Sequence, residues 1–305
     1  MLICNIMGVL VKTFRALVAS IKLRQIRRKN SDSIIFVATS GLGDICYALS
    51  YISALKKANN KKVLVVCSPY AKELLTFYPD IDEIICLTDK QTKYFKPLGN
   101  TFLARFHFNN KNNRIPVYTC DAWSFLPMRV VNLPNINFFD IINYVNYELR
   151  GVGEIQYPIV PECDIEKFHI INWEKTIVIN PHSNFLNTNS SIFKKSASLL
   201  VAKGYQVFTN VSSCYDKPIE GTAPLVCNLQ EFYNIVKRIK CLISVRSGLL
   251  DYAVNCGGDF LVIYNKDNDG LFKKVYSLNY WKGRSLITEF DSDQEGEIYA
   301  YIERL

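Results

Sequence analysis

The chain has 305 residues, of which 49% are hydrophobic and 21% are charged, so it is neither disordered nor of low complexity. This length favours two domains over one. The formal net charge is +8, but residues 1–30 hold seven basic residues and no acidic one, which leaves the rest of the chain almost neutral. The charge pattern therefore argues against a globally basic nucleic-acid-binding protein.

The first segment, residues 1–30, is predicted to form an amphipathic, basic helix. Apolar residues recur within it at spacings of three and four, which place them in one stripe: Ile3, Ile6, Leu10, Phe14, Leu17 and Ile21. Its longest uncharged run is shorter than the roughly 20 residues of a spanning helix, and the basic residues follow the apolar part, unlike those of a signal peptide. Two interpretations stay open for residues 2–29: a helix on the anionic inner surface of a membrane, or a helix packed on the protein itself or on a second subunit.

From Ser33 onward, short apolar runs alternate with helical patterns, which predicts parallel, doubly wound sheets. The expected strands are residues 34–39, 63–67, 83–87, 114–118, 176–180, 205–209, 225–227, the run before Arg246, and 259–264. The expected helices follow the first strand to about residue 58 and then cover residues 69–78, 138–149, 192–202, 231–239 and 292–305. Prolines make residues 157–161 an extended linker. We therefore expect two α/β domains, residues 31–160 and 161–290, with a C-terminal helix over residues 291–305.

The ten cysteines contain no Cys-x-x-Cys pair, and several lie in or beside apolar runs: Cys67, Cys86, Cys227 and Cys241. In such runs a reduced cysteine behaves as a small hydrophobic side chain. We therefore expect a reducing, cytoplasmic compartment and no disulfide framework. The chain has only three histidines and no His-Glu-x-x-His motif, so no protein-built metal site is expected either.

The turn Ser40-Gly-Leu-Gly-Asp44 follows the first strand of the α/β series. It is not a dinucleotide-binding Gly-x-Gly-x-x-Gly motif, because Cys46 stands at the third glycine position, and no acidic residue closes the next strand. The turn instead offers the Asp44 carboxylate at a helix start, on the edge of the sheet where open α/β folds bind ligands. The alternative is that Asp44 only caps its helix.

A second turn, Arg246-Ser-Gly248, leads from a buried strand into a helix. The helix start points backbone N–H groups and a positive dipole end outward, and Arg246 adds a fork suited to two phosphate oxygens. Gly248 lets a ligand approach the backbone closely. These parts form a plausible diphosphate site. The alternative is that Ser247 caps the helix while Arg246 pairs with a local carboxylate.

Residues 37–56, containing Ser-Gly-Leu-Gly-Asp44, and the strand Ile177-Val-Ile-Asn-Pro181 resemble bacterial heptosyltransferase-like glycosyltransferases of family 9. The Ser244-Val-Arg-Ser-Gly-Leu-Leu-Asp251 stretch is similar to the Ser-x-Arg-Ser-Gly-Leu-x-Asp form of surface-polysaccharide glycosyltransferases, some of them fucosyltransferase-like. Together the likeness covers roughly residues 33–87 and 175–265. It implies the GT-B fold: α/β, with two Rossmann-like doubly wound domains facing a cleft and a final helix that packs back on the N-terminal domain.

The resemblance also implies roles for particular residues. The family's Gly-Asp motif maps onto Gly43-Asp44, so Asp44 is the expected general base of an acceptor-side domain, with Gly41 and Gly43 in its cleft loop. The C-terminal domain is expected to bind a nucleotide sugar through these residues: Arg246, Ser247, Gly248, Asp251, His182 and Ser183. Asp251 has two open interpretations: it binds the nucleotide or sugar, or it holds Arg246 in place.

The chain departs from the heptosyltransferase pattern at two points. Arg246-Ser-Gly-Leu-Leu-Asp251 replaces the family's Asp-Ser/Thr-Gly-x-x-His, and no Lys-x-Trp signature precedes Ile192. Heptose is therefore not implied as the sugar. The departures also keep open a non-catalytic glycosyltransferase-like subunit.

The sequence thus predicts a glycosyltransferase of the hexosyl- or heptosyltransferase type that is metal-independent, uses no cofactor and is inverting. Its expected partners are a nucleotide-diphosphate sugar and a lipid-linked or surface-glycan acceptor (lipopolysaccharide, O-antigen or capsule), with no nucleic acid. We expect it in the cytoplasm, with residues 2–29 peripheral on the inner membrane under the first interpretation of that helix. Besides the non-catalytic subunit, a nucleotide-sugar epimerase or hydrolase on the same scaffold is the alternative.

Overall fold

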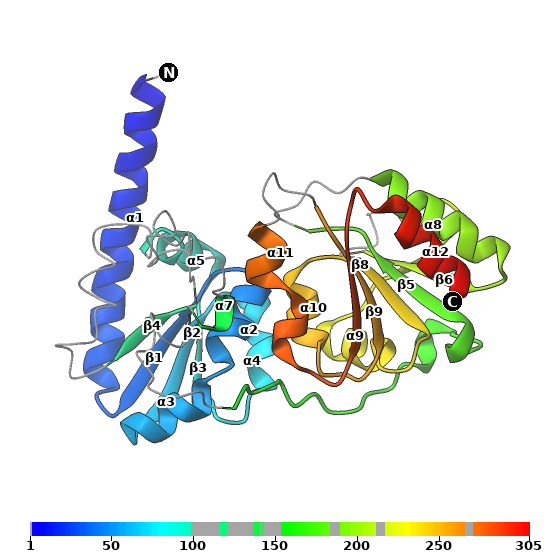
Figure 1. Cartoon of the computed structure of the whole chain (residues 1–305). Coiled ribbons are helices and arrows are strands. Elements are labelled where there is room, and N and C mark those ends of the chain that lie inside the picture. The colour runs from blue at the N-terminus through cyan, green and yellow to red at the C-terminus, as the bar shows by residue number, and fades with distance from the viewer. Residues whose placement is uncertain are drawn as a thin grey trace. The chain divides into compact units, whose positions relative to one another are not determined.

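The computed structural model describes residues 2–98, 116–120, 137–140, 142, 154–183, 190–211, 217–265 and 271–305. They divide into two compact units, Met1–Ile159 and Val160–Leu305, each built on its own parallel sheet (Figure 1). The predicted α/β class with two doubly wound sheets is confirmed.

The first unit holds a four-stranded sheet in the order β3-β2-β1-β4, and every pairing in it is parallel. Its strands are β1 (Ser33–Ala38), β2 (Lys62–Cys67), β3 (Glu83–Cys86) and β4 (Val117–Thr119). Its helices are α1 (Leu2–Lys29), α2 (Leu42–Leu49), α3 (Ile52–Asn59), η1 (Pro69–Ala71), α4 (Lys72–Thr76), α5 (Asp89–Phe95) and α7 (Phe138–Asp140). Most of the helix predicted for residues 138–149 lies outside the described residues.

The single helix expected after β1 is two helices, α2 and α3, separated at Ser50 and Tyr51. The Ser50 hydroxyl donates to the carbonyl oxygen of Tyr47 at 2.6 Å, and the Ser50 N–H bonds the same carbonyl. A serine that bonds the backbone three residues earlier competes with the regular helical pattern. The apolar periodicity runs through the break, so the sequence pattern did not reveal it.

The second unit holds a six-stranded parallel sheet in the order β10-β9-β8-β5-β6-β7. Its strands are β5 (Thr176–Asn180), β6 (Gln206–Asn210), β7 (Ala223–Leu225), β8 (Cys241–Val245), β9 (Asp259–Tyr264) and β10 (Leu286–Asp291). Its helices are η6 (Glu166–Phe168), η7 (Trp173–Lys175), α8 (Ser190–Ala202), α9 (Leu229–Val236), α10 (Gly248–Ala253), α11 (Leu271–Tyr276), η8 (Leu278–Trp281) and α12 (Glu295–Arg304).

This strand order is that of a Rossmann fold. The chain starts at β5, proceeds outward through β6 and β7, and then returns to the other side of β5 to add β8, β9 and β10. In the first unit, β1, β2, β3 and then β4 repeat the beginning of the same scheme. The order reverses between β5 and β8 in one unit and between β1 and β4 in the other. Open α/β sheets bind ligands beyond the carboxyl ends of the strands at such a switch point.

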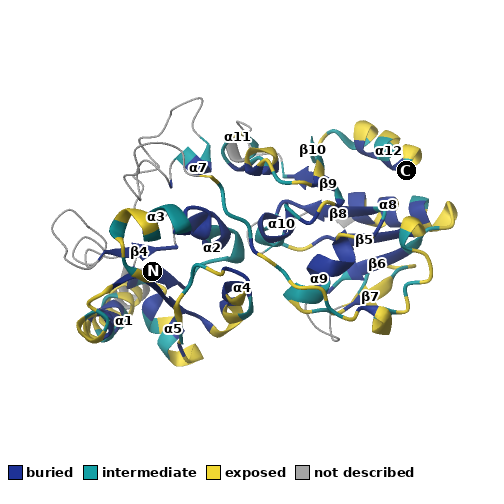
Figure 2. Cartoon of the chain, turned by 90° about the horizontal axis from the view of Figure 1, so that it is seen from below, coloured by how far each residue is buried: buried dark blue, intermediate teal, exposed yellow. Residues whose placement is uncertain are grey.

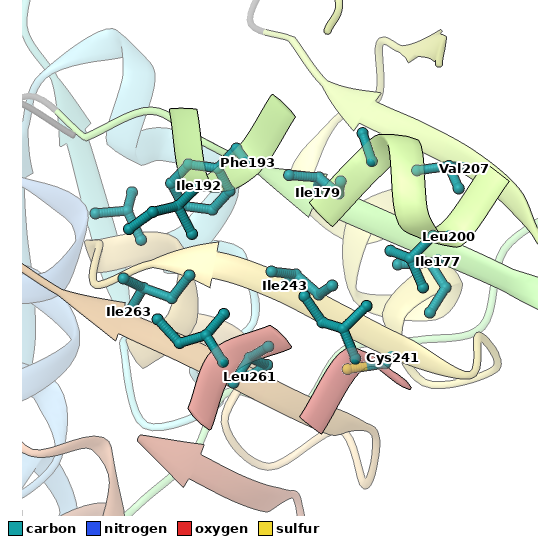
Figure 3. Close-up of a cluster of buried hydrophobic side chains, with 14 residues drawn as sticks. Ile177, Ile179, Ile192, Phe193, Leu200, Val207, Cys241, Ile243, Leu261 and Ile263 are labelled. Carbon is teal, nitrogen blue, oxygen red and sulfur yellow. The ribbon is translucent and has the colours of Figure 1, made fainter. Parts of the chain in front are cut away.

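The central strands of both sheets are buried, as Figure 2 shows in dark blue. In the second unit, α8 and α12 cover one face, and Ile177, Ile179, Ile243 and Leu261 point toward them from the sheet (Figure 3). Strand β10, which the sequence did not predict, is mostly half-buried at the sheet edge.

The C-terminal helix α12 contributes to the core of the second unit. Ile298 and Ile302 of α12 are fully buried in the core of the second unit, and Lys203 Nζ donates to the carbonyl oxygen of Glu303 at 2.6 Å. The i, i+4 isoleucine pair of α12 therefore completes the core of its own domain, and a contact of residues 291–305 with the N-terminal domain stays a prediction.

Candidate functional site

Polar side chains gather at the switch point of the second unit, where β5 and β8 end. Asn180, the last residue of β5, donates through Nδ2 to the Ser244 hydroxyl at 2.9 Å and to the Ser247 hydroxyl at 3.4 Å. Its Oδ1 accepts from Asn210 Nδ2, at the end of β6, at 3.0 Å. These residues therefore connect the ends of three strands at the edge where this fold binds ligands.

A buried ion pair between Arg246 and Asp251 fixes the turn that follows β8. The Arg246 and Asp251 side chains are 4% and 2% exposed, and their two parallel contacts measure 2.9 Å (Nη1 to Oδ2) and 2.5 Å (Nη2 to Oδ1). Arg246 also donates through Nε to the carbonyl oxygen of Tyr276 at 2.9 Å and through Nη1 to that of Ser247 at 2.8 Å. Trp281 Nε1 donates to Asp251 at 2.8 Å. This geometry favours the interpretation in which Asp251 holds Arg246 in place.

A second set of hydrogen bonds, centred on the half-buried Glu289, secures residues 276–281, which bond Arg246 and Asp251. Glu289 of β10 accepts from the Tyr264 hydroxyl at 2.5 Å, the Leu278 N–H at 2.7 Å and the Ser277 hydroxyl at 2.6 Å. Burial raises the pKa of Tyr264 well above its ordinary value, although Arg246 acts to lower it. The tyrosine therefore stays a neutral donor and keeps residues 276–281 against the sheet.

Ser247 and Gly248, in the same turn, are more accessible than Arg246. Ser247 is the N-terminal cap residue of α10 with extended backbone, and Ser247 and Gly248 are half-buried, unlike Arg246. Backbone N–H groups in the first turn of a helix have no acceptor within it, so they are available to an anion. The loop after β5 places an exposed His182 and a half-buried Ser183 near the end of the same strand.

In the first unit, the switch point between β1 and β4 is bridged in a comparable way. Ser40, two residues beyond β1, donates through its hydroxyl to the carbonyl oxygen of Cys120 at 2.9 Å, just after β4. The Tyr70 hydroxyl, from the segment after β2, donates to the carbonyl oxygen of Ser40. Tyr70 is about half exposed. It is therefore a surface tyrosine anchored to the turn that leads to Asp44.

Asp44 stands in the first turn of α2, three residues after the cap residue Gly41 and one after Gly43, and it is half-buried. It lies close enough to Tyr70 to influence that side chain: burial raises the pKa of Tyr70, and the negative charge of Asp44 acts in the same direction, against a hydrogen bond with Ser68. The structure thus brings Asp44, Ser40 and Tyr70 to one edge of the first sheet. The sequence interpretation missed Tyr70, and its position just after a strand was the available signal.

Within the described residues, no group of three or more His, Cys, Asp or Glu side chains is arranged to hold a metal ion, and no helix is long and apolar enough to cross a membrane. All eight cysteines whose side chains the structure describes are thiols.

No protein-family model matches the chain, and no curated protein matches it by sequence. Solved structures do match it. A family 9 glycosyltransferase from Veillonella parvula superposes with a TM-score of 0.58 at 15% identity, over 90% of each chain. The fold is GT-B. An E. coli ADP-heptose lipopolysaccharide heptosyltransferase II matches with a TM-score of 0.55 at 12% identity, over 89% of this chain and 99% of that one.

A third GT-B structure, an E. coli heptosyltransferase with ADP, has a TM-score of 0.52 at 11% identity over 89% of this chain and 97% of that one. At these low identities the superpositions show a shared fold of two Rossmann-like domains along nearly the whole chain. The GT-B assignment places each of the two switch points described above in its own Rossmann-like domain, one with Asp44 and one with Ser247 and Gly248.

Proposed function

We propose that this protein is a glycosyltransferase that moves a sugar from a nucleotide-diphosphate donor to a lipid-linked or surface-glycan acceptor, such as lipopolysaccharide, O-antigen or capsule. The observation that carries this proposal is the GT-B architecture with a polar switch point in each domain. Structural neighbours that are heptosyltransferases were solved with ADP and with ADP-2-deoxy-2-fluoro heptose, which supports a nucleotide sugar as the donor.

The second domain binds the donor in this proposal. The diphosphate meets the backbone N–H groups that begin at Ser247 and Gly248, while His182 and Ser183 approach the nucleotide from the loop after β5. Because the Arg246 guanidinium is buried and bonded to Asp251, its charge is largely balanced within the domain. We therefore assign Arg246 and Asp251 the task of holding the turn in shape, with the N–H groups and the Ser247 hydroxyl as the contacts to the diphosphate.

Asp44 is the proposed general base. A carboxylate in hydrogen-bond reach of the acceptor hydroxyl accepts its proton while the oxygen attacks C1 of the sugar from the side opposite the diphosphate, which inverts the configuration. Backbone N–H groups at the helix start stabilise the negative charge that builds on the departing diphosphate, so the reaction needs no metal ion in this scheme. Thiol cysteines in both domains agree with a cytoplasmic site for the reaction.

The first test is a thermal-shift measurement with ADP, UDP, GDP, CMP and their common sugars. A ligand at about a hundred times its Kd stabilises a protein by about 2.7 kcal/mol, which moves the melting temperature by several degrees. We expect one nucleotide to shift the wild type and to lose its effect in Ser247→Asp. Aspartate is as good a cap residue as serine, so this variant keeps α10 but places a negative charge where the diphosphate binds.

The matched control is Ser198→Asp, on the exposed side of α8, which should keep the full shift. If no nucleotide shifts the wild type, the donor site is absent and the chain is a non-catalytic subunit. If donor is consumed without any acceptor, the protein is an epimerase or hydrolase on this scaffold.

A further inference from the structure

Helix α1 packs on the first domain with only one face of its second half. Ala16, Ala19, Leu23 and Ile26 are buried against a core that also contains Phe95 of α5. Figure 1 shows α5 beside the second half of α1, while the first half extends beyond it. The small side chains of Ala16 and Ala19 allow α1 to approach the domain core closely. The larger apolar residues of α1 lie on other faces of the helix.

Those larger residues form a stripe on the outer face, which we call the outer stripe: Leu10, Phe14, Leu17 and Ile21. Each is between 45% and 61% exposed. At 100° per residue the four lie within about 60° of one another and roughly opposite the buried face. The stripe is about 17 Å long at 1.5 Å per residue. These four residues belong to the apolar stripe predicted from the sequence, and in the structure they face solvent.

Basic residues continue the outer stripe toward its C-terminal end and flank it on one side. Exposed Arg24 and Arg28 continue it at the same spacing of three and four, and Arg15 and Lys22 lie along one side. Residues 1–31 contain seven lysines and arginines and no acidic residue. Two of these charges are close enough to act on each other: burial lowers the pKa of Arg27, and the charge of Arg24 lowers it further. The exposed face of α1 is therefore both apolar and strongly positive.

This charge distribution discriminates between the surfaces that could cover the stripe. A second copy of α1 would bring another seven positive charges and no negative one alongside the first, and like charges oppose such pairing. An anionic lipid surface provides hydrocarbon for the apolar residues and negative headgroups for the arginines. Because no described helix can cross a membrane, α1 would lie along the surface.

We propose that the outer stripe of α1 docks the protein on an anionic lipid surface, with Phe14 and its apolar neighbours among the acyl chains and Arg24 and Arg28 at the headgroups. The C-terminal half of the helix stays packed on the domain, so docking needs no unfolding. The proposal concerns α1 alone and holds whatever sugar the protein transfers.

The test is flotation of the full-length protein with vesicles of phosphatidylglycerol and phosphatidylcholine, compared with phosphatidylcholine alone. We expect binding only to the anionic vesicles and weaker binding at high salt. Leu10→Gln/Phe14→Gln should lower binding at least about tenfold. The control Val201→Gln/Val226→Gln removes two similarly exposed apolar residues in the second domain and should bind as the wild type does. All four substituted positions are exposed, so the variants should keep the wild-type circular dichroism spectrum and melting temperature.

A second variant pair separates charge from insertion. Arg24→Gln/Arg28→Gln should weaken binding to anionic vesicles in the same way as high salt. The fluorescence of Phe14→Trp should shift to shorter wavelength when those vesicles are added, and that of Val201→Trp should not. The proposal is overturned if the wild type ignores anionic vesicles at low salt, or if the outer-stripe variant binds as well as the wild type. It is equally overturned if the wild type is a dimer without vesicle affinity that the outer-stripe variant dissociates, because a second copy then covers the stripe.

Discussion

Arg246 and Asp251, five residues apart, form a two-point ion pair across the turn from β8 into α10, with both side chains almost fully buried. The pair also holds the indole N–H of Trp281 and, through Arg246, the carbonyl oxygen of Tyr276. A guanidinium bonded on all these sides fixes the backbone of the turn. The accessible residues Ser247 and Gly248 therefore sit on a rigid base, which is the condition for a preorganised anion site.

Removing one member of this pair should be costly. Asp251→Ala leaves the Arg246 charge buried without its carboxylate, and such a loss typically costs about 3–5 kcal/mol of unfolding free energy. Replacing both residues, as in Arg246→Met/Asp251→Leu, should recover most of that loss, because no uncompensated charge remains. Urea denaturation of the three proteins measures both effects.

The matched control for the ion pair is Glu162→Gln. Glu162 pairs with Lys237 and Arg238 on the surface, where all three side chains are 45% or more exposed. Such exposed pairs contribute less than about 1 kcal/mol. Equal losses in Asp251→Ala and Glu162→Gln would contradict the structural role assigned to the buried pair.

Two glycines give opposite predictions for the same substitution. A Cβ atom on Gly283 would lie 2.4 Å from the carbonyl oxygen of Val254, whereas one on Gly296, in the first turn of α12, meets nothing within 4 Å. Gly283→Ala should therefore lower the unfolding free energy by about 1–3 kcal/mol, and Gly296→Ala should raise it by about 0.4–1 kcal/mol. Chemical denaturation that finds the same sign for both would show that the close approach at Gly283 is absent in solution.

Cys241 should make the protein less stable at alkaline pH. Burial raises the pKa of the Cys241 thiol to about 12, against about 8.5 for a cysteine in an unfolded chain. Between pH 8.5 and 12 the thiol keeps its proton in the folded state but has lost it in the unfolded state. The unfolding free energy is therefore unaffected by this thiol below about pH 8.5 and falls as the pH rises toward 12. At about pH 10.5, two units above the pKa of the unfolded chain, the loss is about 2.7 kcal/mol.

Urea unfolding at neutral pH and at about pH 10.5 measures this dependence. Cys241→Ala should lose less stability than the wild type over the interval, because it removes one of the groups that titrate differently in the two states. Ile243→Val is the control, since Ile243 is fully buried in the same strand and carries no titrating group, and its pH dependence should follow that of the wild type. A wild type and Cys241→Ala with parallel pH profiles would exclude the buried thiol as a cause.

The central strands of both sheets were the easiest to predict from the sequence. Strands β1, β5 and β8 are continuously buried, and they read as uninterrupted apolar runs. Strand β10 was missed because Leu286–Asp291 is a half-buried edge strand that mixes apolar, polar and acidic residues. A pattern based on apolar runs therefore finds the central strands and the edge strand β3 (Glu83–Cys86), and it misses an edge strand whose apolar residues are interrupted, as in β10.

The arrangement of the site was less predictable. The turn at Arg246 was visible in the sequence, but its partners include Tyr276 and Trp281, thirty and more residues away, and no local spacing links them to it. The contact between Tyr70 and Ser40 likewise joins segments thirty residues apart. Local patterns predicted the turns that follow the central strands, and the tertiary contacts decide which residues of those turns stay accessible.

Helix α1 shows that a correct period does not identify the buried face. Its apolar stripe was predicted at the right spacing, yet the domain core takes Ala16 and Ala19 from the other side. Large apolar residues usually mark the packed face. Here small residues permit the close contact, so only the structure could show that Phe14 faces outward.

The base assignment gives the most direct functional prediction. Asp44→Asn keeps the size and polarity of the side chain but removes the proton acceptor, so transfer to the acceptor should fall by about 10²–10⁴-fold. The nucleotide-induced thermal shift should remain, because the donor binds the other domain in our proposal. The control is Asp89→Asn, an exposed acid in the first turn of α5 in the same domain, which should transfer at the wild-type rate. If Asp44→Asn retained full transfer while Ser247→Asp abolished it, the donor site would stand and the base would have to be another group.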